Sequence, residues 1–250
     1  VRGNALLGHL ADIQNNHKEA LHAYSIAIRL AVDKQAALKP WVLVLRGLSY
    51  LHRGRFPEAH EDFAKAVELS PNSILALEHL AEVQGRLGKI EDSAATYQKV
   101  LLLTRNPEFL EAFAGIEETR GNKEQAQALI AEARAGYDKM LKEFPKAAYG
   151  HAIDFYLGPG DDAALAVSLA EKDSKLRPNG DTFLALAQAH LANKGHAEAK
   201  QALDKALQYP HRSADLHWTA SEIHRALGDA DKAAAEEKSA LAINPLQASM

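Results

Sequence analysis

Histidine and the acidic residues are the side chains of this sequence that could act as metal ligands or as acids and bases. The chain holds 12 histidines. A helix presents two ligands to one metal ion when they lie three or four residues apart, and no two histidines have that spacing. Mixed pairs at such a spacing include His9 with Asp12 and His79 with Glu82. Exposed histidines on the first helix of a repeat explain these two pairs adequately. We therefore predict no metal site and no cofactor.

Nucleophilic and nucleotide chemistry also lack the residues that they need. The absence of cysteine excludes a thiol nucleophile, and no serine lies in a Gly-x-Ser-x-Gly sequence. "HEDF" at His60 lacks the second histidine of the zinc-protease motif. "GPGDD" (158–162) lacks the Lys and Ser/Thr of a phosphate loop, and Asp161 or Asp162 is expected to cap a helix there. We predict that the protein is not an enzyme.

The charge balance and composition limit the classes of partner. Lys and Arg total 29 against 33 for Asp and Glu, a formal net charge of -4, which is not the basic footprint of a nucleic-acid binder. No apolar run approaches the roughly 18 residues needed to cross a bilayer. We expect a protein or peptide partner, no nucleic acid and no membrane insertion by this chain. Because the chain begins at Val1, a preceding signal or anchor and the compartment stay open.

Small residues recur at a fixed interval, which indicates a repeat array. If Ala59 is counted as place 20 of a repeat, the same place elsewhere holds Ala20, Ser93, Ala126, Ala166, Ala199 and Ala233. The steps along this series are 39, 34, 33, 40, 33 and 34 residues. Places 8 and 27 are also mostly small, so two helices of each repeat can approach closely. The pattern predicts a period of 34 residues with two longer repeats.

Large side chains and helix-ending residues keep the same register. In the first four repeats and the sixth, place 24 holds large apolar side chains that would fill the space beside the small ones: Tyr24, Phe63, Tyr97, Ile130 and Leu203. The fifth and seventh repeats have Ala170 and Glu237 there. Place 15 holds Gly54, Gly88, Gly121 and Gly228, where a residue with positive φ would end the first helix. Seven of the nine prolines fall between repeats or at the chain's end, and none interrupts a helix interior. Each repeat is therefore expected to form two amphipathic helices.

These residues resemble the tetratricopeptide repeat, a helix–turn–helix unit of 34 residues with small side chains at places 8, 20 and 27. The resemblance covers nearly the whole chain and implies an all-α fold, an α-solenoid of about seven repeats wound into a right-handed superhelix. We expect one solenoid over 1–250, with repeats at 1–39, 40–73, 74–106, 107–145, 146–179, 180–212 and 213–250. The fifth repeat fits least well, because Asp154 and Asp173 fall on packing places. A hinge near residues 143–162 is the alternative to a continuous stack.

Two segments beside the fifth repeat are unusual. Residues 131–145 extend the second helix of the fourth repeat by about six residues beyond the family length. The segment that follows groups Tyr149, His151, Phe155 and Tyr156. We favour a core cluster for these four side chains over a ligand site.

The resemblance also implies where a partner would bind, because in this family places 2, 5, 9 and 12 of each first helix line a groove that receives a peptide. In the second repeat these places hold four apolar residues: Trp41, Val44, Leu48 and Leu51. In the third and fourth repeats they hold an acidic row that includes Glu78, Glu82, Glu111 and Glu118. A segment with apolar anchors followed by Lys or Arg would suit both surfaces. The alternatives are that residues 31–39 cover Trp41 and Val44, and that the glutamates form only a solvated face.

The leading interpretation is a non-enzymatic scaffold that binds a peptide segment of a partner in the concave groove. A chaperone-tail adaptor is not expected, because Ala5 and His9 stand where such adaptors of this family carry the Lys and Asn of their carboxylate clamp. The alternative is an accessory subunit of a bacterial secretion, envelope or regulatory complex that binds through its convex face or its C-terminal end. The sequence stops five residues after Pro245 without a polar capping helix, so self-association through the last repeat is a further expectation.

Overall fold

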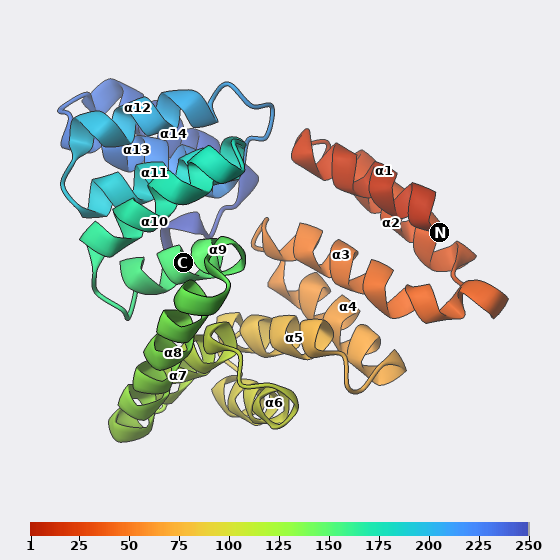
Figure 1. Cartoon of the computed structure of the whole chain (residues 1–250). Helices are drawn as coiled ribbons and strands as arrows, with labels where there is room; N and C mark the ends of the chain where they lie inside the picture. The colour runs from red at the N-terminus through yellow and green to blue at the C-terminus, as the bar shows by residue number, and fades with distance from the viewer. Residues whose placement is uncertain (250) are drawn as a thin grey trace. The chain divides into compact units, whose positions relative to one another are not determined.

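The computed structural model describes residues 1–249 and shows, over that range, 14 α-helices, two short 3-10 helices and no β-strand (Figure 1). The all-α expectation is therefore confirmed. The chain divides into two compact units, residues 1–129 and 130–250, and the boundary falls inside helix α8. This boundary lies before the hinge expected near residues 143–162, and the continuous solenoid stays a prediction.

The first unit contains three helical hairpins and the first helix of a fourth. Its helices are α1 (Arg2–Ile13), α2 (His17–Leu30), α3 (Lys39–Leu51), α4 (Phe56–Leu69), α5 (Ile74–Arg86), α6 (Ile90–Leu103) and α7 (Pro107–Thr119), with the 3-10 helix η1 (Asp33–Leu38) before α3. Helices α1, α3 and α5 each pack against the even-numbered helix that follows and against the next odd-numbered helix. The odd-numbered first helices thus form one continuous layer.

The second unit repeats this arrangement. It begins within α8 (Lys123–Glu143) and continues with α9 (Pro145–Leu157), α10 (Ala163–Leu176), α11 (Gly180–Ala192), α12 (His196–Ala206), α13 (Ala214–Ala226), α14 (Ala230–Ile243) and η2 (Gln247–Ser249). The hairpins are α9 with α10, α11 with α12 and α13 with α14, and the first helices α9, α11 and α13 contact one another in sequence. Within the described residues no helix is long and apolar enough to cross a membrane.

The turn inside every repeat contains one residue with positive φ at place 15. The four glycines predicted for this place have φ between 67° at Gly54 and 81° at Gly121. The other three repeats place there Asn15 (56°), Asp161 (46°) and Lys194 (61°). The steps between these seven positions equal those of the place-20 series. The seven-repeat register is therefore visible in the backbone itself, even where the residue is not glycine.

Small and large side chains pack against each other as the register predicts. All seven residues at place 20 are at most 3% exposed. In the first repeat a Cβ added to Gly8 would lie 2.7 Å from the ring of Tyr24, and in the second repeat one added to Gly47 would lie 2.4 Å from Phe63. Both rings are fully buried, and burying a side chain of this size stabilises the fold by roughly 1.5–3 kcal/mol.

The fifth repeat differs from the others at the end of its first helix. Helix α9 ends at Leu157, and the Gly158–Gly160 segment separates it from Asp161. Pro159 cannot donate to a helix, and the N–H of Gly160 instead donates to the carbonyl of Phe155 at 2.7 Å. Elsewhere α5, α7, α11 and α13 end two residues before the positive-φ residue.

The longer turn shifts the packing face of α9 along its sequence. Ala152 and Ile153 are fully buried, whereas Asp154 is exposed, so the expectation that Asp154 occupies a packing place is wrong. Asp173 does occupy one, because it is only 3% exposed and pairs with Arg177 at 2.6 Å.

The aromatic cluster that follows α8 belongs to the core of the second unit. Helix α8 spans 21 residues, which confirms the long helix. Its Tyr137 packs on Phe155 with ring centroids 4.9 Å apart, and the hydroxyl of Tyr156 donates to Asp138 at 2.6 Å. Phe155 and Tyr156 are buried, although His151 is exposed. The core interpretation is confirmed for the two buried rings.

Candidate functional site

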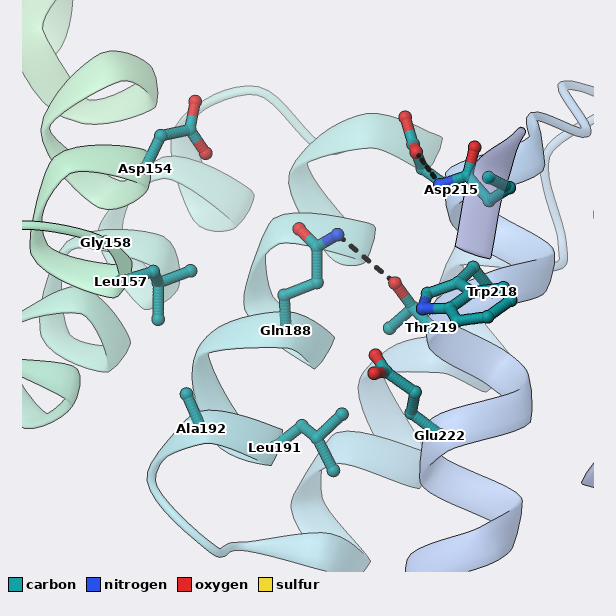
Figure 2. A pocket seen from close by; sticks show the side chains of 11 residues that line it. Asp154, Leu157, Gly158, Gln188, Leu191, Ala192, Asp215, Trp218, Thr219 and Glu222 are labelled. Carbon is teal, nitrogen blue, oxygen red and sulfur yellow. Dashed lines mark hydrogen bonds between the residues drawn. The ribbon is translucent and has the colours of Figure 1, made fainter. Parts of the chain in front are cut away.

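The first helices of the second unit form a pocket of about 520 Å³ (Figure 2). Its walls come from α9, α11 and α13, and one residue of η2 completes them. The lining residues are Asp154, Leu157, Gly158, Gln188, Leu191, Ala192, Asp215, Trp218, Thr219, Glu222 and Gln247. Because α11 contacts both α9 and α13, the pocket is a surface feature of the first-helix layer.

The repeat register explains which side chains of α11 and α13 reach this pocket. Gln188 and Leu191 stand at places 9 and 12 of the sixth repeat, and Asp215, Trp218 and Glu222 stand at places 2, 5 and 9 of the seventh. The groove residues predicted from the sequence lie only in the second to fourth repeats, so none of these five was predicted. The same rule applied to the last two repeats would have found these five residues.

Asp154 reaches the pocket for a different reason. The turn after α9 shifts the register of that helix, so Asp154 lines the pocket instead of packing between helices. Asp154 is still in contact with solvent. The surrounding protein nevertheless desolvates its carboxyl group, which raises the pKa of Asp154 above its usual range. The charge of His151 acts in the opposite direction. No sequence signal that we used distinguishes this position.

Two hydrogen bonds hold four of the polar side chains of the pocket in place. Gln247 Nε2 donates to Asp215 Oδ1 at 2.7 Å, and Gln188 Nε2 donates to Thr219 Oγ1 at 3.2 Å (Figure 2). The lining residues comprise three carboxylates, several apolar side chains and one indole, but no Lys, Arg, His or Cys. Such a surface can bind a ligand through apolar contacts and a few polar groups that fix its orientation.

The apolar residues predicted as a groove surface on α3 divide into two kinds. Trp41 is 41% exposed and Leu48 is half-buried, so both present surface to solvent. Val44 and Leu51 are 1% and 4% exposed and belong to a core cluster that includes Phe63. The reason is that α3 packs against α1, α4 and α5, which leaves only part of its apolar stripe uncovered.

The predicted acidic row is also divided. Glu78 and Glu82 are both half-buried on α5 and lie on either side of His79, with Nδ1 of the imidazole 2.9 Å from Glu78 and 3.3 Å from Glu82. The ring of His79 stacks on Phe63 with centroids 5.4 Å apart. Glu111 is half-buried and Glu118 is exposed, both on α7, and neither belongs to the His79 cluster.

The potential ligand atoms of Glu78, His79 and Glu82 lie within 4.8 Å of one another, as a metal site would require. Burial lowers the pKa of His79, but the hydrogen bonds and charges of the two glutamates outweigh it and raise the pKa to about 9. The raised pKa favours the protonated imidazole between the two carboxylates. We interpret the cluster as an ion pair of one imidazolium with two carboxylates.

Comparison with known families finds a match to repeats in each of the two units of the chain. A family model described as tetratricopeptide repeat matches residues 40–73, and a second model with the same description matches residues 184–248. The chain is 32% identical over 108 residues to the human superkiller complex protein 3, covering 40% of this chain and 6% of that protein. It is 32% identical over 65 residues to a TPR repeat-containing protein of Methanocaldococcus jannaschii, covering 26% and 12%. The matches thus span only a small part of these relatives.

Solved structures show the same fold. A tetratricopeptide repeat protein from Parabacteroides merdae superposes with a TM-score of 0.55 at 17% identity, over 97% of this chain and 92% of that one. The structure of the APC/C hetero-tetramer Cut9–Hcn1 gives a TM-score of 0.53 at 18% identity, over 96% of this chain and 46% of that one. At these identities the likeness concerns the fold alone.

Proposed function

Because this chain is a tetratricopeptide repeat protein, we propose that it is a non-enzymatic interaction scaffold that binds a peptide segment of a partner protein on its first helices. Stacked repeats of this kind present one face of successive first helices as a continuous surface. Segments of other proteins bind such surfaces as extended strands or short helices, anchored by a few side chains.

The pocket on α9, α11 and α13 is the observation that carries the proposal. Its volume of about 520 Å³ falls within the usual range for sites that enclose small ligands or single side chains. Trp218 and Leu191 supply apolar contact area, while Gln188 and Glu222 supply polar groups that can fix the orientation of a ligand. A pocket of this size receives one or two anchoring side chains of a segment, not a folded domain.

The first unit contributes a second proposed contact surface. Its apolar members are Trp41, which is exposed, and Leu48, which is half-buried. Val44 and Leu51 lie in the core and hold α3 in place. The acidic contacts that we propose for the same partner class are Glu78, Glu82, Glu111 and Glu118. Each unit is proposed as a binding surface in its own right.

Selection of peptides by the purified whole chain tests this proposal. Random 12-residue peptides displayed on phage would be selected, resynthesised and titrated calorimetrically against the chain and its variants. We expect the affinity of each selected peptide to fall by about tenfold or more in Trp218→Ala or in Trp41→Ala. A tenfold fall corresponds to roughly 1.4 kcal/mol of binding free energy.

The control variants replace apolar residues of similar exposure on second helices. Leu176 on α10 is 41% exposed and Leu103 on α6 is 43% exposed. We expect Leu176→Ala and Leu103→Ala to leave the affinity unchanged. Peptides whose binding depends on these two leucines and on neither tryptophan would contradict the proposal.

A further inference from the structure

We propose that the pocket of the second unit recognises a basic side chain of the partner's segment, and that it prefers arginine to lysine. This inference rests on the proposed function and adds the chemical class of the bound side chain. It is carried by the combination of a pocket, three carboxylates and a half-buried indole, which α9 and α13 supply.

The charge of the pocket has one sign. Asp154, Asp215 and Glu222 line it, and no Lys or Arg is among its lining residues. The basic residue next along α13 is turned toward α14, because Arg225 donates to Glu237 at 2.6 Å. His217 on the same helix lies 2.6 Å from Glu236, also on α14. The face of α13 toward the pocket therefore keeps its negative charge, which is complementary to a cationic ligand.

The carboxylates approach the pocket from different helices. In Figure 2, Asp154 on α9 lies across the pocket from Trp218 and Glu222 on α13. No described residue donates a hydrogen bond to Glu222, whereas Gln247 donates to one oxygen of Asp215 and leaves the other available. A bound cation would thus find carboxylate oxygens on two sides.

The apolar part of the pocket suits the rest of a long basic side chain. Leu157, Leu191 and Ala192 can contact the methylene groups of its stem. The indole of Trp218 is half-buried and stands one helical turn from Glu222. A cation near an indole face is attracted by the ring quadrupole, and the attraction is largest for tryptophan among the aromatic side chains.

Arginine fits this arrangement better than lysine. A guanidinium carries five N–H donors in a plane, so it can bond to carboxylates on two sides while its face stacks on an aromatic ring. An ammonium is a compact charge with a more strongly held hydration shell. Carboxylates from two helices beside an indole therefore favour arginine, whose donors point in several directions.

Four peptides of one design test the inference on the whole chain. They are acetyl-Ala-Ala-X-Ala-Ala-amide, in which X is arginine, lysine, citrulline or leucine. Citrulline has nearly the shape of arginine without its charge. The chain contains two tryptophans, so a spectrum of the ¹⁵N-labelled indole N–H groups reports separately on Trp218 and on Trp41 in the other unit.

We expect the arginine peptide to shift the Trp218 signal saturably and to bind about tenfold more tightly than the citrulline peptide, as loss of charge-assisted hydrogen bonds implies. The lysine peptide should bind with intermediate affinity, and the Trp41 signal should stay in place. Equal affinities for arginine and citrulline, or no shift of Trp218 by the arginine peptide, would overturn the inference. The proposed function is tested separately by the display-selected peptides, because their selection does not require a basic residue.

Charge-removing variants complete the test. Glu222→Gln and Asp154→Asn should each weaken the arginine peptide at least several-fold and leave the citrulline peptide unaffected. Glu171 is exposed on α10 and does not line the pocket, so Glu171→Gln changes the net charge equally and should have no effect. If Glu171→Gln lost as much affinity as the pocket variants, the effect would come from the net charge of the chain, and the inference of a basic-side-chain site would be overturned.

Discussion

The ring of Phe63 occupies the space beside Gly47 that any side chain at that position would need. A Cβ on Gly47 would lie 2.4 Å from Cε1 of Phe63, and Gly8 and Tyr24 repeat the relationship one repeat earlier. The close approach of the two helices of a hairpin is thus built from one missing side chain and one large ring.

Gly47→Ala should therefore destabilise the first unit by about 1–3 kcal/mol, because Phe63 is fully buried and has little room to move. Equilibrium unfolding in urea measures the effect. Gly115→Ala is the matched control, since Gly115 also lies within a helix but a Cβ there meets nothing within 4 Å. That variant should be neutral or more stable by roughly 0.5–1 kcal/mol. Equal destabilisation by both substitutions would contradict the packing argument.

Glu117 is a buried carboxylate that sequence analysis did not identify. It is 0% exposed and accepts hydrogen bonds from Arg120 at 2.7 Å and from Asn122 at 2.6 Å. Glu117→Ala removes the acceptor of both and should cost roughly 2–4 kcal/mol of unfolding free energy. The neighbouring Glu118 is exposed, and Glu118→Gln should change stability by less than about 0.5 kcal/mol. A stability loss at Glu117 no larger than at Glu118 would show that the hydrogen-bonded cluster is not stabilising.

The His79 cluster makes stability depend on pH. The pKa of His79 is raised from 6.5 to about 9 in the folded chain, so its stabilising contribution is fully present below pH 6.5. It is lost as the pH rises through about 9, where the folded form also deprotonates. Between pH 6 and pH 9.5 the free energy of unfolding of the wild type should fall by roughly 1–3 kcal/mol more than that of His79→Gln.

Urea unfolding of both proteins at the two pH values measures this difference. Groups elsewhere titrate alike in wild type and variant, so their contribution cancels in the comparison. Parallel pH profiles would mean that the imidazole is not held between Glu78 and Glu82 as a cation.

The turns offer a reciprocal pair of substitutions at place 15. Lys194 has φ of 61° and Gly228 has φ of 79°, a region that costs a residue with a side chain about 1 kcal/mol or more. Lys194→Gly should stabilise the chain by about 0.5–1 kcal/mol, and Gly228→Ala should destabilise it by a similar amount. A Cβ at residue 228 meets no atom within 4 Å, so the second effect reports backbone strain alone. Melting temperatures that move in the same direction for both variants would contradict the assignment of these turns.

The repeat architecture was predictable because its signals are local and periodic. Gly54 and its counterparts mark a backbone conformation, and Ala59 and its counterparts mark a helix crossing, so each repeat confirms the next. Burial of Val44 and Leu51 was not predictable in the same way. It depends on how far α5 covers α3, which is a property of neighbouring repeats rather than of one helix.

The candidate site shows a second limit. Trp218 and Glu222 could have been found, because they stand at the groove places of a regular repeat. Asp154 could not, because the Gly158–Gly160 turn changes the register of α9 by an amount that only the structure shows. The hydrogen bond from Gln247 to Asp215 joins residues 32 positions apart and has no periodic signal.

Backbone amide spectra of the whole chain during titration with a display-selected peptide test most directly whether the first helices bind the partner. We predict that the largest shifts fall on first helices, with those of the second unit centred on Gln188, Trp218 and Glu222. Shifts confined to the second helices, such as α10, α12 and α14, would contradict the proposed binding face.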